Sequence, residues 1–167
     1  MDNPPWQQES VIKQSQLILN SFEFWSKHDF FNKKGLLDIK KSLLDIQGSP
    51  QEQAQKLFNA PLVVVSHGTQ SNPILNYGTQ KALDMWELSW QKFTQTPSRD
   101  TAESIEQAER DRLLAETTKQ GFCEFSVIRI TSTGKRFKIN QGVVWNLIDE
   151  QQVYQGQAAV YSDFYFL

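Results

Sequence analysis

Residues 121–161 constrain the fold more than any other part of the chain, because they contain three long apolar segments separated by two turn sequences. The pair Thr133-Gly134 is typical of a two-residue hairpin turn, since glycine adopts the positive φ that such turns require. Counting outward from this turn pairs Ile130 with Phe137 and Arg129 with Lys138. One face of the predicted sheet then carries Ile128, Ile130, Phe137, Ile139, Val143, Trp145 and Leu147, and the other carries Arg129, Arg136, Lys138, Asn140 and Asn146. An antiparallel sheet with one apolar face has to cover it with helices or a ligand.

The first sixty residues are predicted to be helical. Two apolar stripes recur at helical spacing, the first ending at Trp25 and the second running from Leu36 to Ile46. Between them, the sequence Lys33-Lys34-Gly35 interrupts the pattern. Ser49-Pro50-Gln51-Glu52 forms a capping box, which predicts the start of a further short helix at Pro50.

The remaining segments alternate between strand and helix patterns. Residues 62–65 and 74–77 are predicted strands, because they are short, apolar and separated by turn residues. A single helix is expected to follow Gly78, with apolar residues at 83, 86, 90 and 93. Asp100 to Glu103 resembles a capping box for a polar helix that ends at Gly121. The predicted order is helices, two strands, two helices and three strands.

Composition excludes several classes of partner and compartment. Seventeen basic and nineteen acidic side chains give a net charge of −2, and no dense basic stripe predicts nucleic-acid binding. No apolar run is long enough to span a membrane. The single cysteine predicts no disulfide framework. We therefore expect a cytoplasmic protein that binds neither nucleic acid nor membrane.

Several of these segments resemble a known family. A strand that ends in asparagine before a helix, followed by a three-stranded meander, is similar to the PAS superfamily of small sensor domains. More specifically, SHG, NPILNYG, TPSR, GKRF, VVWNLIDE, GQAA and the pair Trp86 and Trp90 resemble the MEKHLA family, over about residues 57–165. The family is found at the C-terminus of class III homeodomain–leucine zipper plant transcription factors and as stand-alone bacterial proteins. Thr79 and Phe164-Tyr165 depart from the family's usual residues.

The resemblance implies an α+β fold in which helices cover a five-stranded antiparallel PAS-like sheet. We expect residues 57–167 to form this domain and residues 1–56 to be an N-terminal helical extension. The extension would act as a dimerisation element or as a cap on its own sheet, because its apolar stripes exceed what a small core absorbs. The implied function is a sensory or interaction module without catalytic activity.

A candidate pocket follows from polar residues on a face that is otherwise apolar. The hairpin count places Ser126 opposite Gln141, and a buried polar pair must bond to each other, to water or to a ligand. Gly156 is expected beside Trp145, where a small residue would leave either close packing or a cavity. The predicted ligand-binding residues are Tyr77, Trp86, Ser126, Gln141 and Trp145, and the expected ligand is small and apolar or aromatic.

Other reactive side chains have simpler explanations. His67 is either a ligand contact or a turn histidine bonded to nearby backbone, and no carboxylate spacing around it predicts a metal site. Cys123 lacks the Asn-Cys-Arg motif of flavin-type light sensors, and the helical stretch 79–120 lacks the histidine that haem-binding PAS domains use. The cofactor is therefore unknown, without a haem, flavin-adduct or metal signature. Arg99, Arg110 and Arg112 could bind an anionic ligand, although nearby carboxylates favour surface ion pairs.

Three functional hypotheses remain open at this point. The first is a homodimeric sensor whose N-terminal helices respond to a ligand. The second is a small enzyme on the cone-shaped fold of ketosteroid isomerase-like proteins, which would need a titratable group in its pocket. The third is a scaffold with a solid core that acts only through protein contacts.

Overall fold

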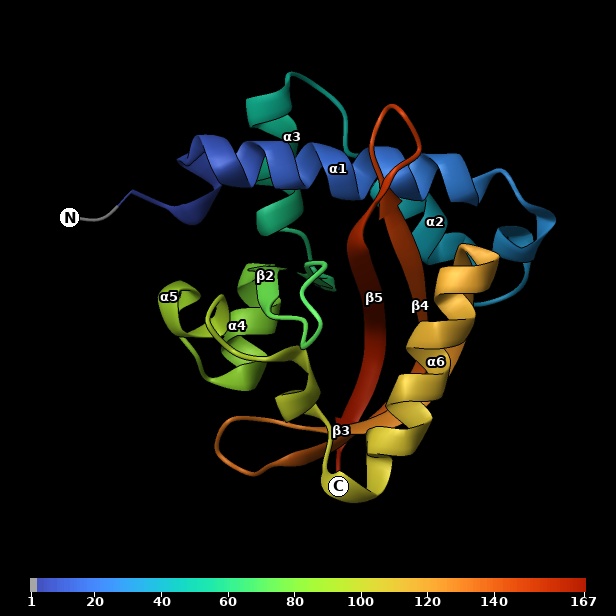
Figure 1. Ribbon diagram of the computed structural model, residues 1–167. Helices are drawn as coiled ribbons and strands as arrows, with labels where there is room; N and C mark the ends of the chain where they lie inside the picture. The colour runs from blue at the N-terminus through green and yellow to red at the C-terminus, as the bar shows by residue number, and fades with distance from the viewer. Residues whose placement is uncertain (1–2) are drawn as a thin grey trace.

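The computed structural model describes residues 3–167 and contains one antiparallel sheet between two groups of helices (Figure 1). The first group comprises α1 (Glu9–Ser26), α2 (Leu36–Leu44) and α3 (Pro50–Phe58). The second comprises α4 (Gln80–Trp86), α5 (Trp90–Phe93) and α6 (Gln107–Gln120). The described residues also form four 3-10 turns. η1 (Pro5–Gln7) precedes α1, η2 (Asp29–Asn32) lies between α1 and α2, and η3 (Ser98–Thr101) and η4 (Ser104–Glu106) lie between α5 and α6.

The sheet contains β1 (Val63–His67), β2 (Leu75–Gly78), β3 (Phe122–Ile130), β4 (Arg136–Ile148) and β5 (Tyr154–Phe166). Its spatial order is β2-β1-β5-β4-β3, and every neighbouring pair is antiparallel. The C-terminal strand β5 therefore occupies the centre, and the two hairpins β1–β2 and β3–β4 flank it. The predicted five-stranded α+β architecture with covering helices is confirmed.

Local sequence signals place several helix ends where they were predicted. Ser49 accepts a hydrogen bond from the backbone of Glu52, whose side chain accepts one from the backbone of Ser49, so α3 begins with a complete capping box. Gly121 follows α6 with a φ of 96°, a backbone conformation that favours glycine. Two predictions were wrong. Glu87 has a φ of 56° and separates α4 from α5, and two 3-10 turns replace the capping box expected at Asp100–Glu103.

The register of the β3–β4 hairpin differs by one residue from the prediction. Thr131 pairs with Lys135 across a three-residue loop, in which Gly134 has a φ of 87°. Arg129 therefore lies opposite Phe137 rather than Lys138. Because side chains alternate between faces, this shift moves Arg129 from the predicted solvent face to the face that bears Phe137.

A second irregularity divides the predicted apolar face of β4. Val127 pairs with Ile139 and Phe125 pairs with Gly142, so β4 has one residue more than β3 between these two pairs. Such a bulge reverses the side on which the following residues point. Phe137, Ile139 and Val144 consequently point toward α4–α6, and we call this side of the sheet the inner face. Val143, Trp145 and Leu147 point toward α1–α3, and we call this side the outer face.

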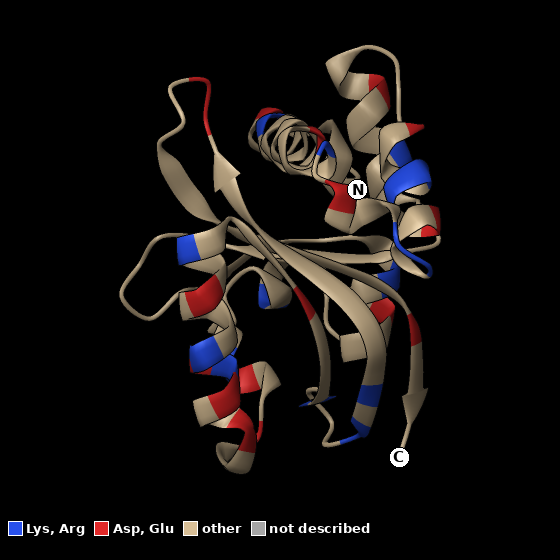
Figure 2. Cartoon of the chain, turned by 90° about the vertical axis from the view of Figure 1, so that its right-hand side faces the viewer, with Lys and Arg blue, Asp and Glu red and all other residues tan. Residues whose placement is uncertain are grey.

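The sheet thus separates two hydrophobic cores (Figure 2). On the outer face, the ring of Trp145 packs edge-to-face on Phe22 of α1, with 5.1 Å between centroids. Two side chains fix α1 to the end of β4. The indole nitrogen of Trp25 donates to the carbonyl of Asn146 (2.9 Å), and the Ser21 hydroxyl bonds both the amide and the carbonyl of Ile148. The N-terminal helices are therefore a packed layer of the molecule.

Candidate functional site

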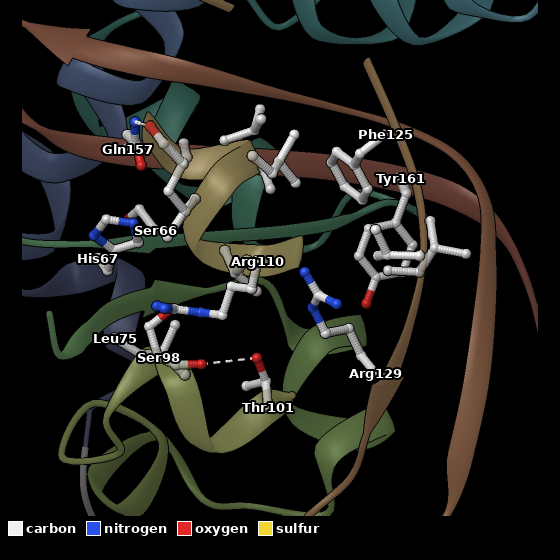
Figure 3. Close-up of a pocket in the computed structure, with 18 of the residues that line it drawn as sticks. Ser66, His67, Leu75, Ser98, Thr101, Arg110, Phe125, Arg129, Gln157 and Tyr161 are labelled. Carbon is white, nitrogen blue, oxygen red and sulfur yellow. Dashed lines mark hydrogen bonds between the residues drawn. The ribbon is translucent and has the colours of Figure 1, made fainter. Parts of the chain in front are cut away.

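The inner face of the sheet encloses a cavity of about 90 Å³ beneath η3 and α6 (Figure 3). Its walls are mainly apolar and include Trp86, Phe93, Leu113, Phe125, Val127 and Ile139. Small-molecule sites in proteins are typically apolar cavities in which a few polar groups converge. The polar lining here comes from β1, β3, β5, η3 and α6, which are distant in sequence.

Two arginines belong to this polar lining, and both are more than nine-tenths buried. Arg110 of α6 donates to the hydroxyl of Ser98 (3.0 Å) and lies 3.3 Å from a carboxylate oxygen of Asp111. Arg129 of β3 donates to the carbonyl of Ile128 (2.9 Å) and lies 3.5 Å from Glu109. Burial lowers the pKa of both guanidinium groups, and the nearby charge of Arg129 lowers the pKa of Arg110 further. Arg110 thus has the ion pair expected from its neighbouring carboxylates, but its side chain is buried and lines the cavity instead of lying on the surface.

His67, at the end of β1, is the third buried polar side chain of the cavity. Its Nδ1 bonds to the carbonyl oxygen of Gly68 at 3.0 Å, which places the proton on Nδ1 and leaves Nε2 as an acceptor. Nε2 has no hydrogen-bond partner among residues 3–167. Burial lowers the pKa of His67 and the charge of Arg110 adds to this shift, whereas the bond to Gly68 and the side chain of Gln157 oppose it.

Gln157 of β5 completes the polar end of the cavity. Its amide nitrogen donates to the side chain of Asn146 (3.1 Å) and to the carbonyl of Leu114 (3.0 Å). Asn146 in turn donates to the carbonyl of Thr118. These bonds tie α6 to the sheet behind His67, and they explain why Asn146, expected on a solvent face, is buried.

Of the five predicted ligand-binding residues, only Trp86 lines this cavity. Its indole nitrogen donates to the carbonyl of Ile130 (3.1 Å). Tyr77 and Trp145 are buried in the core beneath the N-terminal helices, where the Tyr77 hydroxyl and the Trp145 indole nitrogen have no hydrogen-bond partner among residues 3–167.

Ser126 and Gln141 lie near the edge of the outer face and do not bond to each other. Ser126 is exposed and its hydroxyl donates to the carbonyl of Ile139, whereas Gln141 donates to Glu124, which also binds Lys33. Gly156 adjoins the backbone of His67 and Gly68 rather than Trp145, and its φ of 120° requires glycine. The structure therefore places four of the five residues on the face opposite the cavity.

Sequence reasoning missed Arg129 and Arg110 as cavity residues and left the role of His67 open. A prediction that used a three-residue loop ending at Gly134 instead of a two-residue turn would have placed Arg129 on the inner face. Helical spacing could have distinguished Arg110 from its exposed neighbour Arg112, since Leu113 and Leu114 follow Arg110 by three and four positions and share its face of α6, which is otherwise largely polar (Figure 2). Their difference depends on how α6 packs on the sheet.

The described part of the chain lacks two other features that could indicate a function. Residues 3–167 contain no group of three or more His, Cys, Asp or Glu side chains that could hold a metal ion. Within the same residues, no helix is both long and apolar enough to cross a membrane. Cys123 is buried on the inner face opposite Val144.

Solved structures similar to this chain include several PAS domains. The PAS domain of a protein from Colwellia psychrerythraea aligns with a TM-score of 0.59 at 11% identity, over 70% of this chain and 95% of that chain. A PAS domain from a two-component sensor histidine kinase aligns with a TM-score of 0.52 at 16% identity, over 68% and 91%. The light-state dimer of the fungal blue-light photoreceptor Vivid aligns with a TM-score of 0.51 at 11% identity, over 63% and 79%. At such low identities the likeness shows a shared PAS fold.

No curated protein matches the chain. The model of the MEKHLA domain, by contrast, matches residues 12–166, from the first turn of α1 to the last residue of β5. The resemblance seen in the short motifs is therefore confirmed over nearly the full length, and the chain belongs to the MEKHLA domain family.

Proposed function

We propose that this chain is a non-catalytic sensory domain that binds a small molecule in the cavity beneath η3 and α6. The observation that carries the proposal is the convergence of His67, Arg110 and Arg129 in an apolar cavity of a PAS fold. Buried polar groups need hydrogen-bond partners, and Nε2 of His67 has none within the described chain. A ligand would supply the missing partner.

Ligand binding would be transmitted through strands whose two faces contact different layers. Val144 and Val143 are neighbours on β4, yet the first packs toward the cavity and the second beneath the N-terminal helices. A ligand that favours one position of β4 and β5 would shift the population of states in which Ser21 and Trp25 hold α1 to the sheet. The N-terminal layer would then report the occupancy of the cavity.

The proposed function can be tested by filling the cavity with a larger side chain. Val127→Phe adds a ring to the cavity wall, and Ile105→Phe adds a ring at a side chain that is 82% exposed. Native mass spectrometry of the purified proteins should show bound small-molecule mass on the wild type and on Ile105→Phe but not on Val127→Phe. Equal bound mass on all three proteins would place the ligand elsewhere, and none on any of them would favour the packed-scaffold hypothesis.

A second candidate site lies beneath the N-terminal helices, where Tyr77 and Trp145 were predicted to contact a ligand. The observation in its favour is a pair of buried polar atoms that have no hydrogen-bond partner within residues 3–167, the Tyr77 hydroxyl and the Trp145 indole nitrogen. If this site holds the ligand, Trp145→Phe should release the bound mass and Val127→Phe should retain it. Ser126 and Gln141 would then contribute from the edge of the same face.

Homodimerisation is a further part of the proposal. The stripe from Leu36 to Ile46 is buried in its own chain, so a dimer would use the exposed apolar side chains near the end of α1 and the β4–β5 turn. These are Phe24, Val153 and Tyr154. Light scattering during size exclusion should give a dimer mass that Phe24→Lys reduces to the monomer mass.

Two further expectations from the sequence, a cytoplasmic location and the absence of catalysis, belong to this proposal. The cytoplasmic location is supported by the single cysteine, which is reduced and buried. Absence of catalysis is supported by the composition of the cavity, since no Asp or Glu of the described chain lines it beside His67. The isomerase-like alternative would need an acid–base pair at that position.

A further inference from the structure

We propose that the ligand of the inner cavity is a small organic carboxylate, whose charged group binds to Arg110 and Arg129 and whose apolar body fills the rest of the cavity. This inference rests on the proposed function and specifies its ligand class. The two arginines come from α6 and β3, nineteen positions apart in the sequence (Arg110 and Arg129), and both line the same cavity (Figure 3).

Each of the two buried guanidinium groups has one carboxylate within ion-pair distance, and both carboxylates are open to solvent. Arg110 is 7% exposed and Arg129 is 8% exposed, and burying a cation is unfavourable unless it is well paired. Asp111 lies 3.3 Å from Arg110 with a side chain that is 71% exposed, and Glu109 lies 3.5 Å from Arg129 with a side chain that is 32% exposed. Solvent-exposed partners of this kind offset little of the cost of burying a cation. An anion inside the cavity would offset both the desolvation of the two cations and their mutual repulsion.

The hydrogen bonds of the two side chains also leave donors free. A guanidinium group carries five N–H donors, and Arg110 uses its donors on Ser98 and Asp111. Arg129 uses one nitrogen for both Ile128 and Glu109. Figure 3 shows Arg110 extending toward His67 and Ser98 and Arg129 entering the same space from its strand. The remaining donors of both groups are thus available to an acceptor in the cavity.

The chemistry of the lining favours a carboxylate with an apolar body over a phosphorylated ligand. A planar carboxylate matches the fork of a guanidinium group, and two such forks can share its oxygens. Beyond the arginines the walls are aromatic and aliphatic, among them Phe125, Val127 and Ile139. The volume of about 90 Å³ is well below the range of about 300–1,000 Å³ for drug-sized ligands, so nucleotides are too large.

Matched acids and amides provide the test. Butyrate and benzoate are compared with butyramide and benzamide, which have nearly the same shape and no charge, at constant ionic strength in chloride. Proton NMR follows the imidazole of His67, with the exposed His28, the only other histidine, as an internal control. At least one acid should shift the His67 resonances in a saturable manner and raise the unfolding temperature, while its amide does neither and His28 stays unchanged.

Substitutions then assign the binding to the two arginines. Arg110→Met and Arg129→Met retain side-chain length and remove the charge, and each should weaken binding of the acid roughly thirtyfold or more. Arg112→Met removes an exposed charge two residues from Arg110 and should leave binding unchanged. Val127→Phe, which keeps all charges and reduces the cavity, should abolish binding.

Three outcomes would overturn the carboxylate assignment. If an amide binds as tightly as its acid, or if both methionine variants bind the acid normally, the cavity holds ligands without selecting an anion, and the proposed sensory function stands. If neither acid shifts His67 in the wild type, the carboxylate assignment fails, and the mass spectrometry of Val127→Phe still decides the sensory function separately. Should the methionine variants not fold, the comparison of acid and amide on the wild type decides the assignment without them.

Discussion

His67 is a buried imidazole whose pKa is lowered mainly by its burial. It is 7% exposed and the charge of Arg110 adds to the shift, whereas the hydrogen bond from Nδ1 to Gly68 and the side chain of Gln157 oppose it. Burial lowers its pKa below the ordinary value of 6.5. The folded state therefore takes up a proton at this site less readily than the unfolded state does.

This difference makes the stability of the protein depend on pH. Below pH 6.5 the unfolded chain binds the His67 proton first, so the free energy of unfolding falls as the pH falls, until the pH reaches the lowered pKa of the folded state. The slope has an upper limit of about 1.4 kcal/mol per pH unit. Urea unfolding followed by tryptophan fluorescence should show that the wild type loses more stability between pH 7.5 and 5.5 than His67→Gln does. His28→Gln serves as the control and should behave like the wild type, and an identical loss in His67→Gln would contradict the assignment.

Arg129 shows why the site could be predicted only in part from the sequence. Its inward orientation depends on one register position in the hairpin, and a count from Thr133-Gly134 as a two-residue turn directs it to solvent. Trp86, predicted from its spacing on a helix, does line the cavity. Helix periodicity tolerates an error of one residue in a turn, whereas strand alternation reverses with it.

At the scale of elements, the sequence of β4 indicates burial on both faces of the sheet, which the prediction of a single apolar face overlooked. Val143, Val144 and Trp145 are three consecutive apolar residues, a pattern typical of a strand buried on both faces. The prediction of a single apolar face required strict alternation, which this run violates. In the structure, β4 has a bulge before Gly142, and the residues after it are buried on both faces of the sheet, as the apolar run indicates.

Because of the three-residue hairpin loop, the stability of the protein should depend on the glycine at position 134. Its φ of 87° is unfavourable for a residue with a Cβ, and among the described residues no atom beyond its chain neighbours lies within 4 Å of the position where that Cβ would be. Gly134→Ala should therefore lower the free energy of unfolding by about 1–2 kcal/mol through the backbone alone. Gly134→Asn should cost less, because asparagine tolerates this conformation. Urea unfolding of both variants checks the prediction, and an alanine variant as stable as the wild type would show that the loop does not need a positive φ.

At the scale of the whole molecule, the N-terminal helices determine whether the sheet can exist alone. The family match begins at residue 12 and so includes most of the segment that we expected to be an extension before residue 57. α1–α3 cover Trp145, Leu147, Val143 and Val160, all of which are 0% exposed. Burying each such side chain contributes about 1.5–3 kcal/mol, against a total stability of about 5–15 kcal/mol for a domain. We therefore expect the fold to depend on these helices as a cap.

We expect the fragment 57–167 not to fold on its own, because it exposes that apolar face and loses the bonds of Ser21 and Trp25 to β4. Circular dichroism should show no cooperative thermal transition for this fragment, and it should bind a hydrophobic dye. A fragment that starts at Pro5 retains η1 and all the helices, and it should unfold like the full chain. Adding a peptide of residues 1–56 to the fragment 57–167 should restore a cooperative transition. If 57–167 instead unfolds cooperatively near the midpoint of the full chain, the first 56 residues are a separable extension, and a signal from the cavity would need another route than the packing of α1 on β4.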